Sequence, residues 1–191
     1  MPLPERAAAI LNFWTQIGPA GWYSGDEAHD TSIRQTFLAD WMLAQSGGLR
    51  HWASSSEGIL AYLILTDQFP RNMFRNQARA FATDPLALTV AARSWQHSFD
   101  RKIEGPIRQF FFLPLMHSEN PFDQGRSVCL FASRMDGNTG NLLHARAHRQ
   151  VIRDFGRFPY RNAALGRVNT PAETAFLREG GYGAVVRTLG A

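Results

Sequence analysis

The first candidates for catalytic chemistry in this sequence are its histidines. The segment His117-Ser118-Glu119 places an imidazole and a carboxylate two residues apart at the end of an expected helix. Because an imidazole titrates near neutral pH and a carboxylate can orient it, the pair suits acid–base catalysis, or it would donate two ligands to a metal. The alternative is structural, in which His117 and Ser118 satisfy the free carbonyls of the helix end.

A second pair of imidazoles, His144 and His148, has the four-residue spacing that puts both rings on one face of a helix. Zinc proteases share this spacing, but they carry a glutamate directly after the first histidine, and this chain does not. Surface or capping roles are therefore favoured over a metal site. The candidate catalytic residues are His117, Glu119 and His148, and no metal or cofactor is expected.

The segment Asp67-Gln68-Phe69-Pro70-Arg71-Asn72, with Arg75 nearby, forms another polar cluster. Asp67 follows the apolar residues Leu60, Leu63 and Ile64 at helical spacing, so its carboxylate is expected to point inward. A buried carboxylate is costly unless it is paired, and Arg71 and Arg75 are the nearest cations. A salt-bridged turn is the favoured interpretation, and a functional carboxylate is the alternative.

Three arginines surround a glycine and proline turn in residues 155–167. They are Arg157, Arg161 and Arg167. Such a turn can present backbone and guanidinium donors to an anion. The same arginines would equally serve as ion-pair partners of Asp67, Glu119 or Glu173.

The composition excludes several classes of protein. With 191 residues, of which 45% are hydrophobic, the chain can bury a sizeable core and is not disordered. The formal net charge is +4 and Lys102 is the only lysine among 20 cationic residues, yet the arginines form no block typical of nucleic-acid binding. No segment resembles a secretory signal or approaches the roughly 20 apolar residues of a membrane span. We expect a cytoplasmic protein without nucleic-acid or membrane partners.

Apolar periodicity and capping signals predict about eight helices to position these residues. The helices are expected near residues 5–18, 27–46, 55–69, 84–97, 106–117, 121–131, 139–156 and 171–180. The start signals are Asp26, Ser54 with Glu57, Thr83, Asn120, Asn138 or Thr139, and Thr170 with Glu173. Pro70 is expected to stop the third helix, and Pro114 to kink the fifth.

No segment shows the alternation and β-branched enrichment of a strand, so the predicted fold class is all-α. Short connections favour antiparallel helices packed in pairs, either as a bundle or as a short superhelix. The length fits a single all-helical domain, residues 1–191.

The ordered motifs resemble those of the bacterial domain-of-unknown-function family 924. The resemblance covers nearly the whole chain, from about Ile10 to Gly181. It is carried by Asp67-Gln68-Phe69-Pro70-Arg71-Asn72, Ala80-Phe81-Ala82-Thr83-Asp84, Leu113-Pro114-Leu115-Met116-His117-Ser118-Glu119 and Phe155-Gly156-Arg157-Phe158-Pro159-Tyr160-Arg161-Asn162. It implies a helical fold of the tetratricopeptide-like superfamily, with a right-handed superhelical or bundle arrangement, and it implies no activity.

The resemblance also implies which residues of this chain belong to the family's motifs. They are Asp67, Gln68, Arg71, Asn72, Arg75, His117, Ser118, Glu119, Gln124, His148, Arg157, Arg161, Asn162 and Arg167. His144 lies outside the pattern, which weakens a two-histidine metal site. Tyr160 stands where the family often has histidine, so no imidazole is expected to act at that turn.

These observations favour a helical-repeat-like binding protein whose polar turns converge on one pocket rich in arginine, histidine and glutamate. The expected ligand is a small carboxylate or phosphate, or an acidic peptide terminus. The candidate binding residues are Asp67, Arg71, Asn72, Arg75, His117, Ser118, Glu119, His148, Arg157, Arg161 and Asn162.

Two other interpretations stay open. One is a hydrolase-like or metal-dependent enzyme, in which His117 and His148 act as acid and base and Glu119 orients them. It requires the three side chains to meet in a cleft. The other is a structural salt-bridge network, with a protein-interaction surface elsewhere on the molecule. The sequence does not indicate the oligomeric state.

Overall fold

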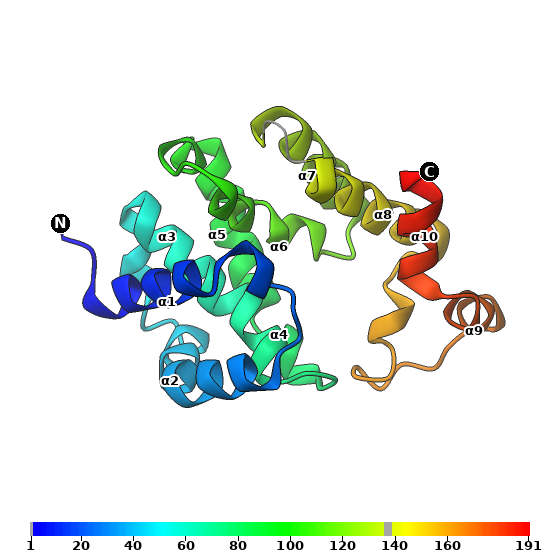
Figure 1. The fold of residues 1–191 in the computed structure, drawn as a ribbon, viewed down its shortest axis with the longest axis horizontal. Helices are drawn as coiled ribbons and strands as arrows, with labels where there is room; N and C mark the ends of the chain where they lie inside the picture. Colours follow the sequence, from blue (N-terminus) through cyan, green and yellow to red (C-terminus); the bar gives the residue numbers. More distant parts are fainter. Residues whose placement is uncertain (1, 136–138) are drawn as a thin grey trace. The chain divides into compact units, whose positions relative to one another are not determined.

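The computed structural model describes residues 2–135 and 139–191, and within them all regular structure is helical, as Figure 1 shows. The α-helices are α1 (Glu5–Gly21), α2 (Glu27–Gln45), α3 (Ser56–Leu63), α4 (Phe69–Met73), α5 (Asp84–Gln96), α6 (Leu113–Met116), α7 (Pro121–Arg134), α8 (Thr139–Phe155), α9 (Pro171–Arg178) and α10 (Gly181–Gly190). Shorter helical segments are η1 (Arg50–Ser54), η2 (Ile64–Gln68), η3 (Ala78–Phe81), η4 (Phe99–Lys102), η5 (Pro106–Phe111) and η6 (Pro159–Arg161). The predicted all-α fold class is confirmed.

The contacts within the chain divide it into two compact units. The N-terminal unit consists of Met1–Arg75 and Arg79–Pro114, and the C-terminal unit consists of Asn76–Ala78 and Leu115–Ala191. That residues 1–191 behave as a single domain, and that the helices follow a tetratricopeptide-like arrangement, both stay predictions.

Aromatic rings form the core of the N-terminal unit. The ring of Phe69 lies at its centre, with ring centroids of Phe37, Trp14 and Phe13 at 5.0, 5.4 and 6.2 Å. Most of these contacts are edge-to-face or tilted, the geometries that aromatic quadrupoles favour. Helices α1, α2 and α4 therefore share one buried cluster.

The predicted stop of the third helix at Pro70 is wrong, because α3, η2 and α4 follow one another without a break. Segment η2 is a π-helical turn, in which the N–H of Phe69 bonds the carbonyl of Ile64 five residues earlier. Pro70 has no N–H to offer the carbonyl of Thr66, and the hydroxyl of Thr83 donates to that oxygen instead, at 2.6 Å. A tertiary contact thus permits the proline inside a helical run.

Two of the predicted helix starts need correction. The side chain of Thr83 does not cap α5, because its hydroxyl is committed to Thr66. Ser54 does not cap α3 either, since Ser55 accepts the N–H of Gly58 at 3.0 Å. At α3 the sequence offers two neighbouring serines, and the second one caps the helix. At α5 the residue at the N-cap is Thr83, but no side chain caps the helix.

The remaining start signals that fall on described residues are confirmed. Asp26 accepts from Ala28 and His29, and Asn120 accepts from Phe122. Thr170 and Glu173 form the complete reciprocal capping box. Thr139 is the first residue of α8, and Asn138 lies outside the described residues.

Differences in helix number have local causes. The predicted helix at 106–117 is divided into η5 and α6, with Phe112 between them. The expected end at Gly180-Gly181 is followed directly by α10, which begins after Gly180 in a left-handed conformation (φ 102°).

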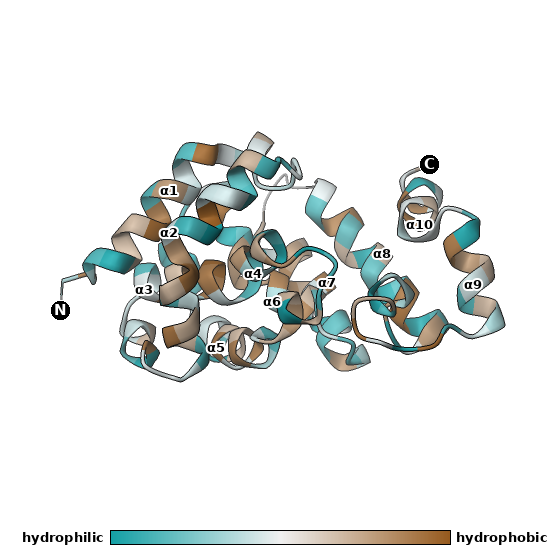
Figure 2. Ribbon diagram, turned by 90° about the horizontal axis from the view of Figure 1, so that it is seen from below, coloured by the Kyte–Doolittle hydropathy of each residue, from teal (hydrophilic) through white to brown (hydrophobic). Residues whose placement is uncertain are grey.

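Helix α8 is the centre of the C-terminal unit and contacts both α7 and α10. Its residues Val151 and Ile152 are buried together with Phe158, and α9 and α10 add partly buried Phe176, Tyr182 and Val185. Figure 2 shows hydrophilic residues alternating with hydrophobic ones along α8, as expected for a helix with one buried face. Within the described residues, no helix is both long and apolar enough to cross a membrane.

Candidate functional site

The predicted site residues fall into two groups, one in each unit. The N-terminal unit contains Asp67, Arg71, Asn72 and Arg75, and the C-terminal unit contains His117, Ser118, Glu119, His148, Arg157, Arg161 and Asn162. That all of them converge on one pocket stays a prediction. Each group is therefore described by its own contacts.

Asp67 is buried in the N-terminal unit, with 1% of its surface exposed, as its position on the helical face predicts. Its carboxylate accepts from Gln68 and pairs with Arg71, whose Nη1 lies 3.3 Å from Oδ1. Arg71 also makes a bidentate pair with Asp84 at the start of α5, both distances being 2.9 Å. One guanidinium thus joins the end of η2 to α5.

Asn72 and Arg75 meet a carboxylate that the sequence analysis did not select. Asp30, buried on α2, accepts from Asn72 Nδ2 at 2.7 Å and from Arg75 Nη2 at 2.9 Å. The Nε of Arg75 donates to the second oxygen of the same carboxylate. This network fixes α2 to the end of α4, as a structural interpretation requires.

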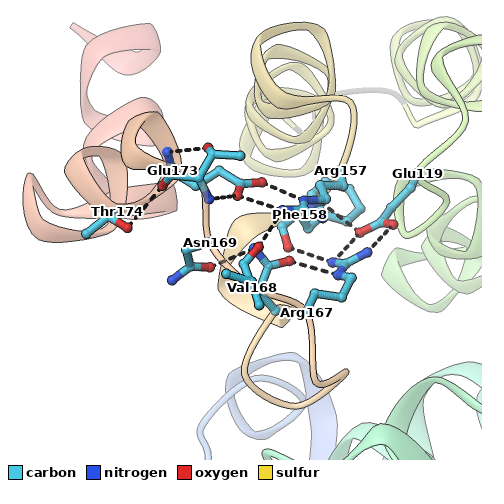
Figure 3. Close-up of polar contacts among 10 residues, drawn as sticks. Glu119, Arg157, Phe158, Arg167, Val168, Asn169, Glu173 and Thr174 are labelled. Atoms are coloured by element: carbon cyan, nitrogen blue, oxygen red, sulfur yellow. Dashed lines mark hydrogen bonds and ion pairs between the residues drawn. The ribbon is translucent and has the colours of Figure 1, made fainter.

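In the C-terminal unit, Glu119 and Arg167 form a bidentate pair, with distances of 2.8 and 3.0 Å (Figure 3). The N–H of Phe158 donates to the same carboxylate at 2.8 Å. Burial acts to raise the pKa of Glu119, but the hydrogen bond from Arg167, the bond from Phe158 and the charges of Arg167 and Arg161 outweigh it and lower the pKa. Glu119 is therefore an ionised anchor for the turn at Phe158.

Arg167 also fixes the turn from within. Its Nε donates to Asn162 Oδ1 at 2.8 Å, and its Nη2 donates to the carbonyl of Phe158 at 3.1 Å. Asn162 is buried, and its Nδ2 donates to Asn169 Oδ1 at 2.7 Å. Arg167 and Asn162 therefore stabilise the turn through hydrogen bonds within the chain.

Arg157 is paired with the capping glutamate of α9. Its Nε and Nη2 lie 2.6 and 2.7 Å from the two oxygens of Glu173, as Figure 3 shows. The hydrogen bond from Arg157 is the main cause that lowers the pKa of Glu173, followed by the bond from the N–H of Thr170. Glu173 is thus both the helix cap and one of the ion-pair partners that the sequence offered for these arginines.

Ser118 has a structural role at the start of α7. Its hydroxyl donates to Asp123 at 2.8 Å and accepts the N–H of Asn120. Gln124, another motif residue, is fully buried and donates its amide to the carbonyls of Met116 and Ser118, both at 2.6 Å. The segment between α6 and α7 is therefore held mainly by side chains of α7.

His148 occupies a different environment, surrounded by aromatic rings. Its ring centroid lies 4.7 Å from Tyr182, 5.4 Å from Phe158 and 6.2 Å from His117. Its Nδ1 donates to the carbonyl of His144 at 2.9 Å, so that Nε2 carries the lone pair of the neutral ring. Burial lowers the pKa of His148 to about 3, with further lowering by the charges of His117, Arg161 and His144.

Arg161 contacts the same Phe158 ring as His148. Its guanidinium is 4.5 Å from the centre of the Phe158 ring, and its Nη1 donates to the carbonyl of His117 at 3.0 Å. We name His117, His148, Phe158, Arg161 and Tyr182 the histidine–arginine cluster. It combines one guanidinium and two imidazoles with aromatic walls, a composition suited to anions.

The enzyme interpretation requires His117, Glu119 and His148 to meet, and it stays a prediction. The rings of His117 and His148 are neighbours, and the carboxylate of Glu119 is engaged by Arg167 and by the N–H of Phe158. Within residues 2–135 and 139–191, no three His, Cys, Asp or Glu side chains group closely enough to hold a metal.

Sequence reasoning missed Asp30 and Tyr182. Asp30 had the same signal as Asp67, since it precedes Ile33 and Phe37 at helical spacing on a buried face. Tyr182 gave no such signal, because its contact with His148 joins helices α8 and α10 across a fold that the sequence does not specify.

Comparisons with other proteins agree with this fold. A model of the family described as bacterial protein of unknown function (DUF924) matches residues 10–181. The structure is similar to that of a protein of unknown function, ATU0120, from Agrobacterium tumefaciens, at 38% identity and a TM-score of 0.86. The similarity covers 91% of this chain and 97% of that one. No protein of curated function matches.

Proposed function

We propose that this chain, which belongs to the bacterial DUF924 family, binds a small anionic ligand at its histidine–arginine cluster. The ligand class is a carboxylate or phosphate, including the carboxylate of an acidic peptide terminus. The observation that carries the proposal is the position of the Arg161 guanidinium. It lies at the face of Phe158 and donates to the carbonyl of His117, whose ring is a neighbour of the half-buried ring of His148.

A positive potential beside aromatic surface favours an anion in two ways. Low local polarity strengthens each charge-assisted hydrogen bond, and Arg161, already held at the face of Phe158, loses little freedom on binding. The opposing carboxylate, Glu119, is neutralised by its bidentate pair with Arg167.

The other arginines of the C-terminal unit support a scaffolding role instead. Arg157 and Arg167 each make a bidentate pair with a glutamate, and a ligand would have to displace that partner. We therefore restrict the binding proposal to the histidine–arginine cluster and assign Arg157 and Arg167 to the structure that supports it.

The test is an NMR titration of the histidine side chains with inorganic phosphate and with acetate. An anion bound beside His148 stabilises its protonated ring, so the pKa of His148 is expected to rise when phosphate is added. The Arg161→Gln variant is expected to weaken phosphate binding about tenfold, the usual cost of a lost charged hydrogen bond.

Arg153→Gln is the matched control, because Arg153 is an exposed arginine on α8, the helix that carries His148. It removes the same charge outside the cluster and is expected to leave binding unchanged. An equal loss in both variants would show only non-specific attraction. Unchanged histidine resonances in the folded wild-type chain at millimolar phosphate would refute the proposal.

A further inference from the structure

The N-terminal unit encloses a cavity of about 330 Å³ that none of the predicted site residues lines. It lies among η1, α3, α5 and η4. Its volume is at the lower end of the range of about 300–1,000 Å³ that is common for small-molecule sites. Ile59, Leu86, Val90 and Phe99 supply apolar walls, so the interior suits a hydrocarbon or aromatic body.

The charged groups of the cavity are all basic. Arg50 and Arg93 line it together with His97, and no acidic side chain does. Neither guanidinium has an ion-pair or hydrogen-bond partner among the described residues, unlike Arg71 and Arg75 in the same unit. The two arginines are therefore available to an anionic group inside the cavity.

The hydroxyl of Tyr62 adds an independent indication of a ligand. Tyr62 lines the cavity with only 3% of its surface exposed, and within the described part of the chain its hydroxyl has no hydrogen-bond partner. The other hydroxyls of the lining are satisfied, because Thr89 donates to Pro85 and Ser94 donates to Ala91. The Tyr62 hydroxyl is therefore free to form a hydrogen bond with a ligand oxygen in the cavity.

The protonation state of Tyr62 fits a donor role. Burial raises the pKa of Tyr62, and the charge of Arg50 acts in the opposite direction without cancelling that effect. The phenol is therefore neutral near pH 7 and can donate its proton in a hydrogen bond. Arg50 and Tyr62 both line the cavity, so one ligand there can meet both groups.

We propose that this cavity binds a small organic monocarboxylate, with its apolar body against Ile59, Leu86 and Val90. Arg50 and Arg93 bind the carboxylate, and Tyr62 donates a hydrogen bond to it. The requirement for an apolar body separates this site from the histidine–arginine cluster, which is proposed for small anions. Failure at one site therefore does not decide the other.

Calorimetric titration with sodium octanoate tests the proposal, with octan-1-ol and inorganic phosphate as comparison ligands. Octanoate is expected to bind one to one, and octan-1-ol is expected to bind about tenfold more weakly. Phosphate is not expected to bind in this cavity. Arg93→Gln is expected to weaken octanoate binding about tenfold and to leave octan-1-ol binding almost unchanged. Val90→Trp, which fills the cavity, is expected to abolish binding of both.

Arg101→Gln is the matched control, since Arg101 is exposed on η4 but does not line the cavity. Circular dichroism confirms that each variant is folded before titration. Absence of saturable octanoate binding by the folded wild-type chain at millimolar concentration would overturn the proposal. So would equal losses in Arg93→Gln and Arg101→Gln, because the carboxylate would then have no specific partner in the cavity.

Discussion

The hydroxyl of Thr83 donates to the carbonyl of Thr66, seventeen residues earlier, and itself accepts the indole N–H of Trp41 at 3.1 Å. Both threonines and the tryptophan are fully buried. The proline at position 70 creates the need for this contact, since it removes the N–H that would otherwise satisfy Thr66. One hydroxyl therefore links α2, η2 and the start of α5.

We expect Thr83→Val to lower the free energy of unfolding by about 2–4 kcal/mol. Valine has nearly the same shape but leaves both the Thr66 carbonyl and the Trp41 indole buried without partners. Urea denaturation followed by tryptophan fluorescence measures the change. Thr89→Val is the control, because Thr89 lies on the same helix with an exposed side chain and is expected to change stability by less than about 0.5 kcal/mol.

Two aspartates of α2 allow a comparison between ion pairs of equal exposure. The side chains of Asp30 and Asp40 are 9% and 12% exposed, and those of their partners Arg75 and Arg6 are 46% and 48% exposed. Asp30 additionally accepts a hydrogen bond from Asn72. Asp30→Ala is therefore expected to destabilise the chain by about 1 kcal/mol more than Asp40→Ala, because it also removes the partner of Asn72. Equal effects in urea denaturation would contradict a special role for the Asp30 network.

The capping glutamate of α9 is expected to make stability depend on acidic pH. The pKa of Glu173 falls from 4.5 to about 2 on folding, mainly through the hydrogen bond from Arg157. Its contribution is therefore fully present above pH 4.5 and is lost as the pH falls toward 2. Unfolding free energies of the wild type and Glu173→Gln should converge over this interval. A difference that stays constant with pH would contradict the assignment.

His148 is expected to remain neutral in the folded chain where an ordinary histidine becomes charged. Its pKa falls from 6.5 to about 3, first through burial and then through the charges of His117 and Arg161. The unfolded chain binds the additional proton between these values, so this part of the stability is complete above pH 6.5 and decreases toward pH 3.

An NMR titration of the imidazole Cε1–H resonances checks this expectation in the absence of added anions. The resonance of His148 should not titrate between pH 8 and 5, and His148→Gln should reduce the pH dependence of unfolding over the same interval. A midpoint for His148 near 6.5 would show that its ring is hydrated in solution, and would contradict the apolar surroundings on which the anion-binding proposal depends.

Local chemistry explains which parts of the fold the sequence predicted. Asp26, Asn120 and Thr170 cap helices because each needs only backbone N–H groups two or three residues away. The inward position of Asp67 follows equally from the periodicity of one helix. The all-α class needs no more than a set of such local signals.

Contacts between distant elements account for what the sequence did not predict. Thr83 carried a strong capping signal, but the buried carbonyl of Thr66 competes for the same hydroxyl. For the candidate site, the sequence offered Glu119 and Glu173 as partners of the arginines but left open whether these arginines form ion pairs or bind an anion. The contacts of Arg157 with Glu173 and of Arg167 with Glu119 favour ion pairs for these two.

The π-helical turn η2 sets the direction in which the following residues point. A helical run with one additional residue is rotated by about 100° with respect to a regular α-helix. Arg71 follows this turn and reaches Asp67 and Asp84 together. Deleting one residue from η2 would keep a helix but turn Arg71 away from its partners. The additional residue therefore sets the rotation of every side chain that follows it in α4.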